Sequence, residues 1–161
     1  MRLDEINDLT QQEFVARLGW VFEHSPWVAE RVWQERPFAS VAHLSDRMSA
    51  VVLAASRIEQ LALLRAHPDL GTRAQVSAGS ASEQAGAGLN QLTQDEYDDL
   101  LRLNNNYRTK FDFPFLYAVK GSGKAGVFEA LRTRSEATHE IEFEEALRQV
   151  FRIARYRLEE L

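Results

Sequence analysis

One histidine of this sequence lies in a setting that suits proton transfer. His67 directly precedes Pro68 in the run 65–71. A residue before proline is restricted to extended backbone conformations, so the imidazole would stand on a rigid support. Histidine has an ordinary pKa of about 6.5 and can therefore act as a general acid or base near neutral pH. The position also suits a histidine that interacts with the last carbonyls of a preceding helix.

A polar run follows the histidine loop. Ser80 and Glu83 have the spacing of a capping box, in which a hydroxyl and a carboxylate satisfy backbone N–H groups at a helix start. With Gln84, the same groups could instead bind a polar ligand at the N-terminus of a helix. Gly86 and Gly88 are poor helix formers and predict that this helix ends early.

The last helix carries an arginine on its apolar face. At about 100° per residue, its apolar side chains fall in one arc of about 160°; they are Phe143, Leu147, Val150, Phe151, Ile153, Ala154, Leu158 and Leu161. Arg157 falls inside this arc, and three other arginines fall opposite. A buried guanidinium needs a partner. The partner could be an internal carboxylate such as Glu83 or the oxygens of a substrate, unless the side chain snorkels to the surface.

Metal chemistry has little support. The chain contains no cysteine, which excludes thiolate ligands, a cysteine nucleophile and disulfides. The four histidines, His24, His43, His67 and His139, do not have the spacing of zinc ligands. We therefore expect no metal site.

Helices must position these residues. Thr10 and Thr93 begin capping-box patterns, Ser25-Pro26 predicts a helix with proline in its first position, and Ser40 predicts a long helix that ends at Pro68. Two further helices are expected over 124–134 and 140–161, the second with a solvated acidic start over 140–145.

Only the stretch 113–119, aromatic and β-branched around a proline, has extended character. One such segment cannot make a sheet. The predicted fold class is therefore all-α, a single-domain compact bundle of about seven or eight helices with one short extended segment, over residues 1–161.

Composition narrows the function. The 161 residues are 45% hydrophobic, which excludes a disordered chain. A net charge of −5 argues against non-specific binding to nucleic acid. No apolar run approaches the ~18 residues of a membrane span, and the acidic N-terminus does not resemble a signal peptide. We expect a cytoplasmic protein that acts on a small molecule.

Three groups of residues, taken together, resemble the decarboxylases that act on 2-oxo-4-hydroxy-4-carboxy-5-ureidoimidazoline (OHCU) in urate degradation. They are His67-Pro68-Asp69-Leu70-Gly71, then Ser80-x-x-Glu83-Gln84 with Ala87-Gly88-Leu89, then Asn104-x-x-Tyr107-x-x-Lys110-Phe111-x-Phe113-Pro114-Phe115. The stretches 37–40 and 153–158 are also similar, so the resemblance covers nearly the whole chain. Asp112 stands where the family usually has glycine, and aspartate tolerates a positive φ better than most residues.

The resemblance implies an all-helical enzyme without cofactor, usually dimeric, that decarboxylates OHCU to (S)-allantoin. It implies that His67 is catalytic, with Glu83 and Arg157 assisting. The substrate-binding residues implied are Pro68, Ser80, Glu83, Gln84, Leu116, Tyr117, Ala118, Val119 and Arg157. Partners are then a small-molecule substrate and a second copy of the chain, with neither nucleic acid nor membrane.

Two other functions use the same residues. A cyclic ureide hydrolase would employ His67 as a general base for water, and a non-catalytic helical module would bind a ligand without turnover. Release of CO₂ distinguishes decarboxylation from the first, and stabilisation by ligand without turnover indicates the second.

Overall fold

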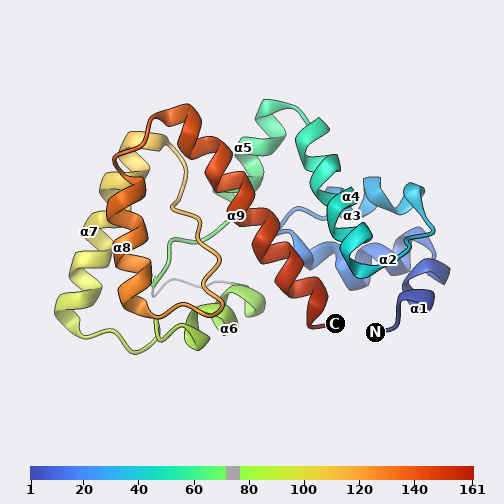
Figure 1. Ribbon diagram of the computed structural model, residues 1–161, viewed down its shortest axis with the longest axis horizontal. Coiled ribbons are helices and arrows are strands. Elements are labelled where there is room, and N and C mark those ends of the chain that lie inside the picture. Colours follow the sequence, from blue (N-terminus) through green and yellow to red (C-terminus); the bar gives the residue numbers. More distant parts are fainter. Residues whose placement is uncertain (72–76) are drawn as a thin grey trace. The chain divides into compact units, whose positions relative to one another are not determined.

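The computed structural model describes residues 1–71 and 77–161. Within these ranges the chain forms α-helices and two short 3-10 helices but no strand, which confirms the all-α prediction (Figure 1). The described residues hold nine α-helices, more than the seven or eight expected: α1 (Leu3–Asp8), α2 (Gln11–Leu18), α3 (Trp27–Val32), α4 (Val41–Ala54), α5 (Arg57–Arg65), α6 (Ala78–Gly86), α7 (Gln94–Phe111), α8 (Lys124–Arg134) and α9 (His139–Glu159). The 3-10 helices are η1 (Gly19–Val21) and η2 (Trp33–Glu35).

The chain divides into two compact units. The terminal unit comprises Met1–Ala66 and Phe151–Leu161, and the central unit comprises His67–Val150. Helix α9 contributes residues to both units, since its span crosses Val150.

In the terminal unit, caps fix where the helices start. The side chains of Thr10 and Ser40 accept hydrogen bonds from the backbone three residues on, as the sequence predicts. Pro26 is the N-cap of α3 rather than its first helical residue. Helices α2, α3 and α4 pack together around a core that includes Phe14, Leu18, Phe22, Val28, Val32, Phe38, Leu44, Met48 and Val52.

The prediction of one long helix from Ser40 to Pro68 is wrong. The chain leaves the helical conformation at Ala55, with ψ of 164°, and restarts as α5. Ser56 caps α5 by accepting from the N–H of Glu59, whose carboxylate accepts from the N–H of Ser56. This capping box satisfies donors that a continuous helix would have used internally, so it stabilises two helices instead of one.

In the central unit, α7 and α8 lie side by side (Figure 1), and an aromatic cluster fills the core. The ring of Tyr107 lies 4.6 Å from that of Phe111 and 5.3 Å from that of Phe115, and Phe113 lies 6.1 Å from Phe143. All five side chains are buried. The stretch 113–119 therefore runs as irregular chain through the core, anchored by alternate aromatic residues.

Asp112 begins this stretch. It ends α7 in the left-handed conformation, with φ of 64° and ψ of 26°. The position thus requires the positive φ that glycine adopts most easily, and aspartate fulfils that requirement as expected.

The expectation of a fully solvated acidic start to α9 is wrong for one residue. Glu142 is only 1% exposed. Its carboxylate accepts from the Tyr107 hydroxyl and from Arg134 Nε at 2.8 Å. The sequence pattern could not reveal this, because both donors come from other helices.

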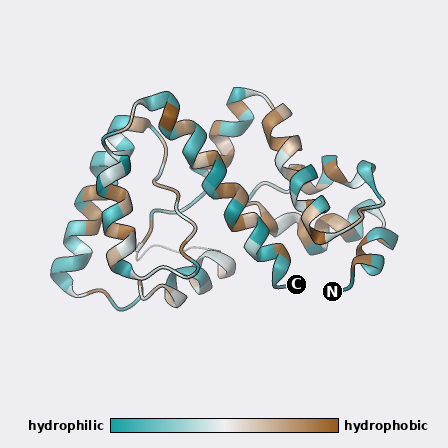
Figure 2. Ribbon diagram, in the orientation of Figure 1, coloured by the Kyte–Doolittle hydropathy of each residue, from teal (hydrophilic) through white to brown (hydrophobic). Residues whose placement is uncertain are grey.

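Helix α9 alternates hydrophilic and hydrophobic residues along its length (Figure 2), as an amphipathic helix does. Among the helices of the described ranges, none is long and apolar enough to cross a membrane.

Candidate active site

The predicted catalytic histidine follows closely after α5. The helix ends at Arg65, and the N–H of the C-cap Ala66 donates back to the carbonyls of Ala62 and Leu63. His67 is 6% exposed and Pro68 is half-buried. His67 therefore lies in the loop 67–71, called here the His67 loop, and not in α5.

Gly71 closes the His67 loop in a conformation that requires glycine. Its φ is +72°, and a Cβ built there would lie 2.3 Å from Leu100 Cδ2. Its N–H donates to Gln84 Oε1 at 2.8 Å. This hydrogen bond joins the His67 loop to α6, so two motifs that are separate in the sequence meet in the central unit.

Helix α6 begins earlier than the sequence predicts, so Ser80, Glu83 and Gln84 all lie within it. Its N-cap is Ser77, whose side chain accepts from the N–H of Ser80, so a capping box of Ser80 with Glu83 is wrong. Ser80 lies inside the helix, one turn before Gln84, and both are buried. Glu83 is half-buried on the same helix. Because Ser77 caps the helix, the Ser80 hydroxyl is not needed for that purpose.

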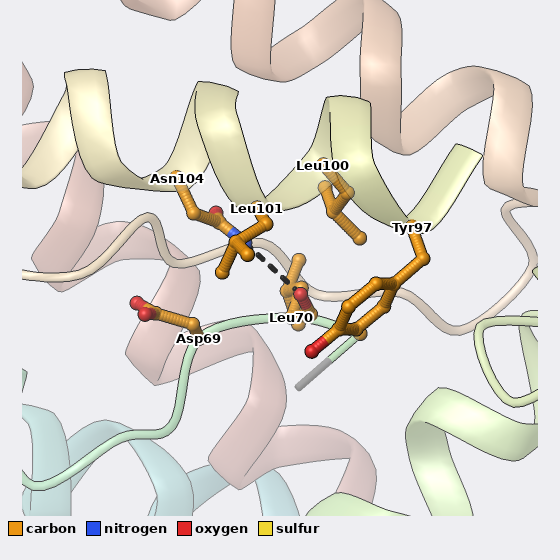
Figure 3. A pocket seen from close by; sticks show the side chains of 7 residues that line it. Asp69, Leu70, Tyr97, Leu100, Leu101 and Asn104 are labelled. Atoms are coloured by element: carbon orange, nitrogen blue, oxygen red, sulfur yellow. Dashed lines mark hydrogen bonds between the residues drawn. The ribbon is translucent and has the colours of Figure 1, made fainter. Parts of the chain in front are cut away.

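A cavity of about 20 Å³ lies between the His67 loop and α7 (Figure 3). Its lining residues are Asp69, Leu70, Gly71, Tyr97, Leu100, Leu101 and Asn104. This volume suits about one water molecule. The cavity is therefore too small to be a substrate site, and belongs to the support of the loop.

The backbone of the predicted binding stretch 116–119 is already partly engaged. Leu116 O accepts from Arg134 Nη1 at 2.5 Å, and Ala118 N donates to Gln149 Oε1 at 2.9 Å. Val119 O accepts from the N–H of Ser122, whose hydroxyl lies 3.2 Å from the Tyr117 hydroxyl. Within the described part of the chain, the N–H groups of Leu116, Tyr117 and Val119 have no acceptor. These are the groups of the stretch that could donate to a ligand.

Arg157 lies in the terminal unit and is 3% exposed, which confirms that it belongs to the apolar face of its helix. Its Nη2 donates to Glu23 Oε2 at 2.9 Å, and Nη1 donates to Trp20 O at 3.1 Å. Glu23 is itself 2% exposed. The guanidinium thus has an internal carboxylate partner, although the sequence suggested Glu83 for that place.

Sequence reasoning missed three polar residues that hold these groups in place. Glu23 directly follows the apolar pair Val21 and Phe22, Glu142 lies in the stretch 140–145 that is expected to be solvated, and Asn104 lies on the buried face of α7. A polar residue at an apolar position of a helix or turn is the signal that could have found Glu23 and Asn104, as it did for Arg157, whereas the burial of Glu142 had no such signal.

Residues 1–71 and 77–161 contain no group of three or more histidine, aspartate or glutamate side chains that could hold a metal ion. The polar groups described above are instead hydrogen-bond donors, carboxylates and an imidazole. This set can bind a polar organic ligand and move a proton.

The chain matches the family model described as OHCU decarboxylase over residues 7–159. It is 44% identical to the uric acid degradation bifunctional protein of Bacillus sp. (strain TB-90), over 100% of this chain but only 32% of that protein. It thus spans about a third of the length of that relative.

Two other matched proteins are covered over a larger share of their own length. The OHCU decarboxylase of Haloferax volcanii is 44% identical over 99% of this chain and 95% of its own length. A crystal structure of (S)-allantoin synthase superimposes with a TM-score of 0.80 at 32% identity, covering 98% of this chain and 53% of that one. On sequence and fold together, the chain belongs to the OHCU decarboxylase family.

Proposed function

We propose that this chain decarboxylates OHCU to (S)-allantoin, as a step of urate degradation. Family membership supports the reaction class. The observation that carries the assignment is the hydrogen bond from Gly71 N to Gln84 Oε1, which ties the His67 loop to the polar face of α6. A proton-transfer group and ligand-binding groups are thereby held in one unit.

The substrate supplies its own electron sink. In OHCU, one ring carbon carries both a carboxylate and a hydroxyl, and the ring holds a C=N bond. When the carbon–carboxylate bond breaks, CO₂ leaves and the electron pair moves into the C=N system. The ring nitrogen takes up one proton, which gives an enol. A second proton then adds at the carbon that bears the ureido group while the enol hydroxyl releases its own proton, so the hydroxyl-bearing carbon becomes a carbonyl and the net uptake is one proton. The face that receives the proton fixes the (S) configuration.

His67 is the proposed proton-transfer group. Its burial removes competing water, and its place before Pro68 restricts the backbone that carries it. Glu83 is assigned to orient the imidazole or to accept from the ureido N–H groups. General acid–base catalysis of this kind typically contributes ~10²–10⁴-fold to a rate.

The remaining central-unit residues are proposed to hold the ring. Because Gln84 Oε1 already accepts from Gly71, its Nε2 is the end of the amide that can donate to a substrate oxygen. Ser80 offers a hydroxyl one turn earlier on the same helix. Of the stretch Leu116, Tyr117, Ala118 and Val119, the backbone N–H groups of Leu116, Tyr117 and Val119 are the proposed donors, since the N–H of Ala118 already donates to Gln149. Pro68 supplies an apolar wall.

Arg157 is proposed to bind the carboxylate or carbonyl oxygens of the substrate. A guanidinium is a fixed fork of N–H donors that suits carboxylate and carbonyl oxygens. In Arg157 this fork is already oriented by Glu23 and by the carbonyls of Trp20 and Val21. The ion pair with Glu23 would then position the fork as well as neutralise it.

The chain is further proposed to act as a cytoplasmic homodimer, without cofactor, metal, nucleic acid or membrane. The acidic composition and the absence of cysteine are consistent with this. Activity that survives exhaustive dialysis against EDTA is the expected result, and loss restored by one particular metal would contradict it.

The decisive experiment generates OHCU in place from urate and follows optical activity. With the chain present, (S)-allantoin should form well above the spontaneous racemic background, with one CO₂ released per product. Turnover without CO₂ release would indicate a hydrolase. Stabilisation by ligand with no turnover would indicate a binding module, and either result would overturn the proposal.

A further inference from the structure

We propose that Asn104 and Arg108, on one stripe of α7, are positioning residues that hold His67 in place through the backbone and side chain of its loop. The link to catalysis rests on the function proposed above. The effect of these residues on the position of the imidazole does not depend on that function and can be measured separately.

Three successive residues of the His67 loop lie along this stripe in reverse order. Gly71 packs against Leu100, Leu70 O accepts from Asn104 Nδ2 at 3.0 Å, and Asp69 Oδ1 lies 2.7 Å from Arg108 Nη2. The α7 residues are four apart, so they stack on one face of the helix. Figure 3 shows the loop running beneath α7, with the amide of Asn104 directed at Leu70.

An asparagine at position 104 lowers the stability of the fold. It lies in the interior of a helix, where asparagine is a poor helix former, and it is 3% exposed. Within the described ranges its Oδ1 is the one buried side-chain polar atom with no hydrogen-bond partner. A buried acceptor without a partner costs free energy. What the asparagine supplies in return is the donor that fixes Leu70.

Arg108 is a weaker second tie. It is 46% exposed, so its ion pair with Asp69 is screened by water. The loop is thus pinned at Gly71 by Gln84, at Leu70 by Asn104 and at Asp69 by Arg108. Since Pro68 restricts the residue before it, fixing these three residues also fixes the direction of the imidazole.

The principal test is Asn104→Ala. Neighbouring Asn105 and Asn106 are exposed on the same helix, so Asn105→Ala and Asn106→Ala make the same chemical change away from the loop. We expect Asn104→Ala to lower kcat by about 10²-fold, the cost of a misplaced catalytic group, with KM changed by only a few-fold because α6 still binds the ring. The two control variants should keep parental kcat and KM.

A second readout needs no substrate. Titration of the histidine side chains by NMR reports on each imidazole, and Asn104→Ala should shift the His67 signals and their titration midpoint. His24, His43 and His139 serve as internal references. Unchanged His67 signals in a folded Asn104→Ala variant would overturn the inference. If the parent chain forms no (S)-allantoin while the His67 signals shift, the proposed function fails and the positioning role stands.

A variant of the exposed Arg108 provides the test if Asn104→Ala does not fold. Arg108→Ala should shift the His67 signals in the same direction and lower kcat by no more than about fivefold. Arg102→Ala is the matched control. Arg102 is an arginine of the same helix whose ion pair, at 3.4 Å, is with Asp99 of that helix. If Arg108→Ala leaves both His67 and kcat as in Arg102→Ala, the stripe does not position the loop.

Discussion

In the central unit the His67 loop is held at its flanking residues, whereas in the terminal unit Arg157 is held by its own side chain. The hydrogen bonds and the ion pair that join the His67 loop to α6 and α7 engage Gly71, Leu70 and Asp69. The guanidinium of Arg157, in contrast, meets a buried carboxylate and a backbone carbonyl directly.

This difference separates two ways of building a functional residue. A side chain supported through its neighbours can be replaced while its support persists, so its loss should affect chemistry more than folding. A charged side chain that satisfies another buried charge cannot be removed without leaving that charge unpaired. The predictions that follow test this contrast, beginning with the largest effect.

His67→Ala should fold like the parent and lose about 10²–10⁴-fold in the rate of stereoselective (S)-allantoin formation. Turnover and thermal melting are measured on the same preparation. His43→Ala, in α4 of the terminal unit, is the control and should retain full activity. Near-parental activity in His67→Ala would remove the imidazole from the mechanism.

Arg157→Met should lower the free energy of unfolding by about 3–5 kcal/mol, because Glu23 is left buried without its partner. Replacing both residues, as Arg157→Met with Glu23→Leu, should recover much of the loss while activity stays low. Arg152→Met, an exposed arginine of the same helix, should change stability by less than about 0.5 kcal/mol. A parental melting temperature in Arg157→Met would show that the ion pair contributes nothing to the fold.

Gly71→Ala should destabilise by about 1–3 kcal/mol, from the positive φ and from overlap with Leu100. Gly88→Ala and Gly121→Ala separate these two causes. Both glycines have positive φ, +80° and +78°, but nothing lies within 4 Å of their added Cβ. Chemical denaturation should therefore give a larger loss at Gly71 than at either control, and Leu100→Ala should reduce the difference. Equal losses at all three would place the whole cost in the backbone.

The smallest effect concerns one capping carboxylate in each unit. The hydrogen bond from Arg31 is the largest cause of the lowered pKa of Glu59, and the backbone N–H of Thr93 is the largest cause for Glu96. A lowered pKa in the folded state stabilises above the unfolded value of about 4.3, and this contribution is lost as pH falls through the folded value. Glu59→Gln and Glu96→Gln should each make the melting temperature less sensitive to acid below pH 5 than in the parent. An unchanged acid slope would show that neither cap is charge-dependent.

The sequence predicted what local spacing determines. Caps at Thr10, Ser40 and Thr93 and the burial of Arg157 all follow from neighbours within one or two helical turns. The positive φ of Asp112 was suggested instead by the resemblance, through the glycine that the family usually has there. The prediction failed where two local signals competed. The apolar period continues from α4 into α5 across Ala55, but the Ser56 capping box ends the helix there, and Ile58 is 81% exposed as a result.

Partners distant in the chain could not be predicted from spacing. Glu23 and Arg157 are separated by 134 residues, and Tyr107 and Glu142 by 35. A pattern can show that a buried charge needs a partner, but only the fold determines which carboxylate provides it. For the same reason the resemblance could suggest site residues, while Asn104 as a support for one of them required the geometry of α7.

The buried hydroxyl of Tyr107 gives the central unit a sensitivity to alkali. Burial first, and then the carboxylate of Glu142, raises the pKa of this phenol above its ordinary value of about 10. Its contribution to stability is complete below pH 10 and declines as hydroxide draws the proton from the unfolded chain. In an ultraviolet titration of phenolate, the ionisation of Tyr107 should coincide with the loss of folded structure in the central unit. This phenol would then report the opening of the central unit itself, an intrinsic optical probe that needs no label.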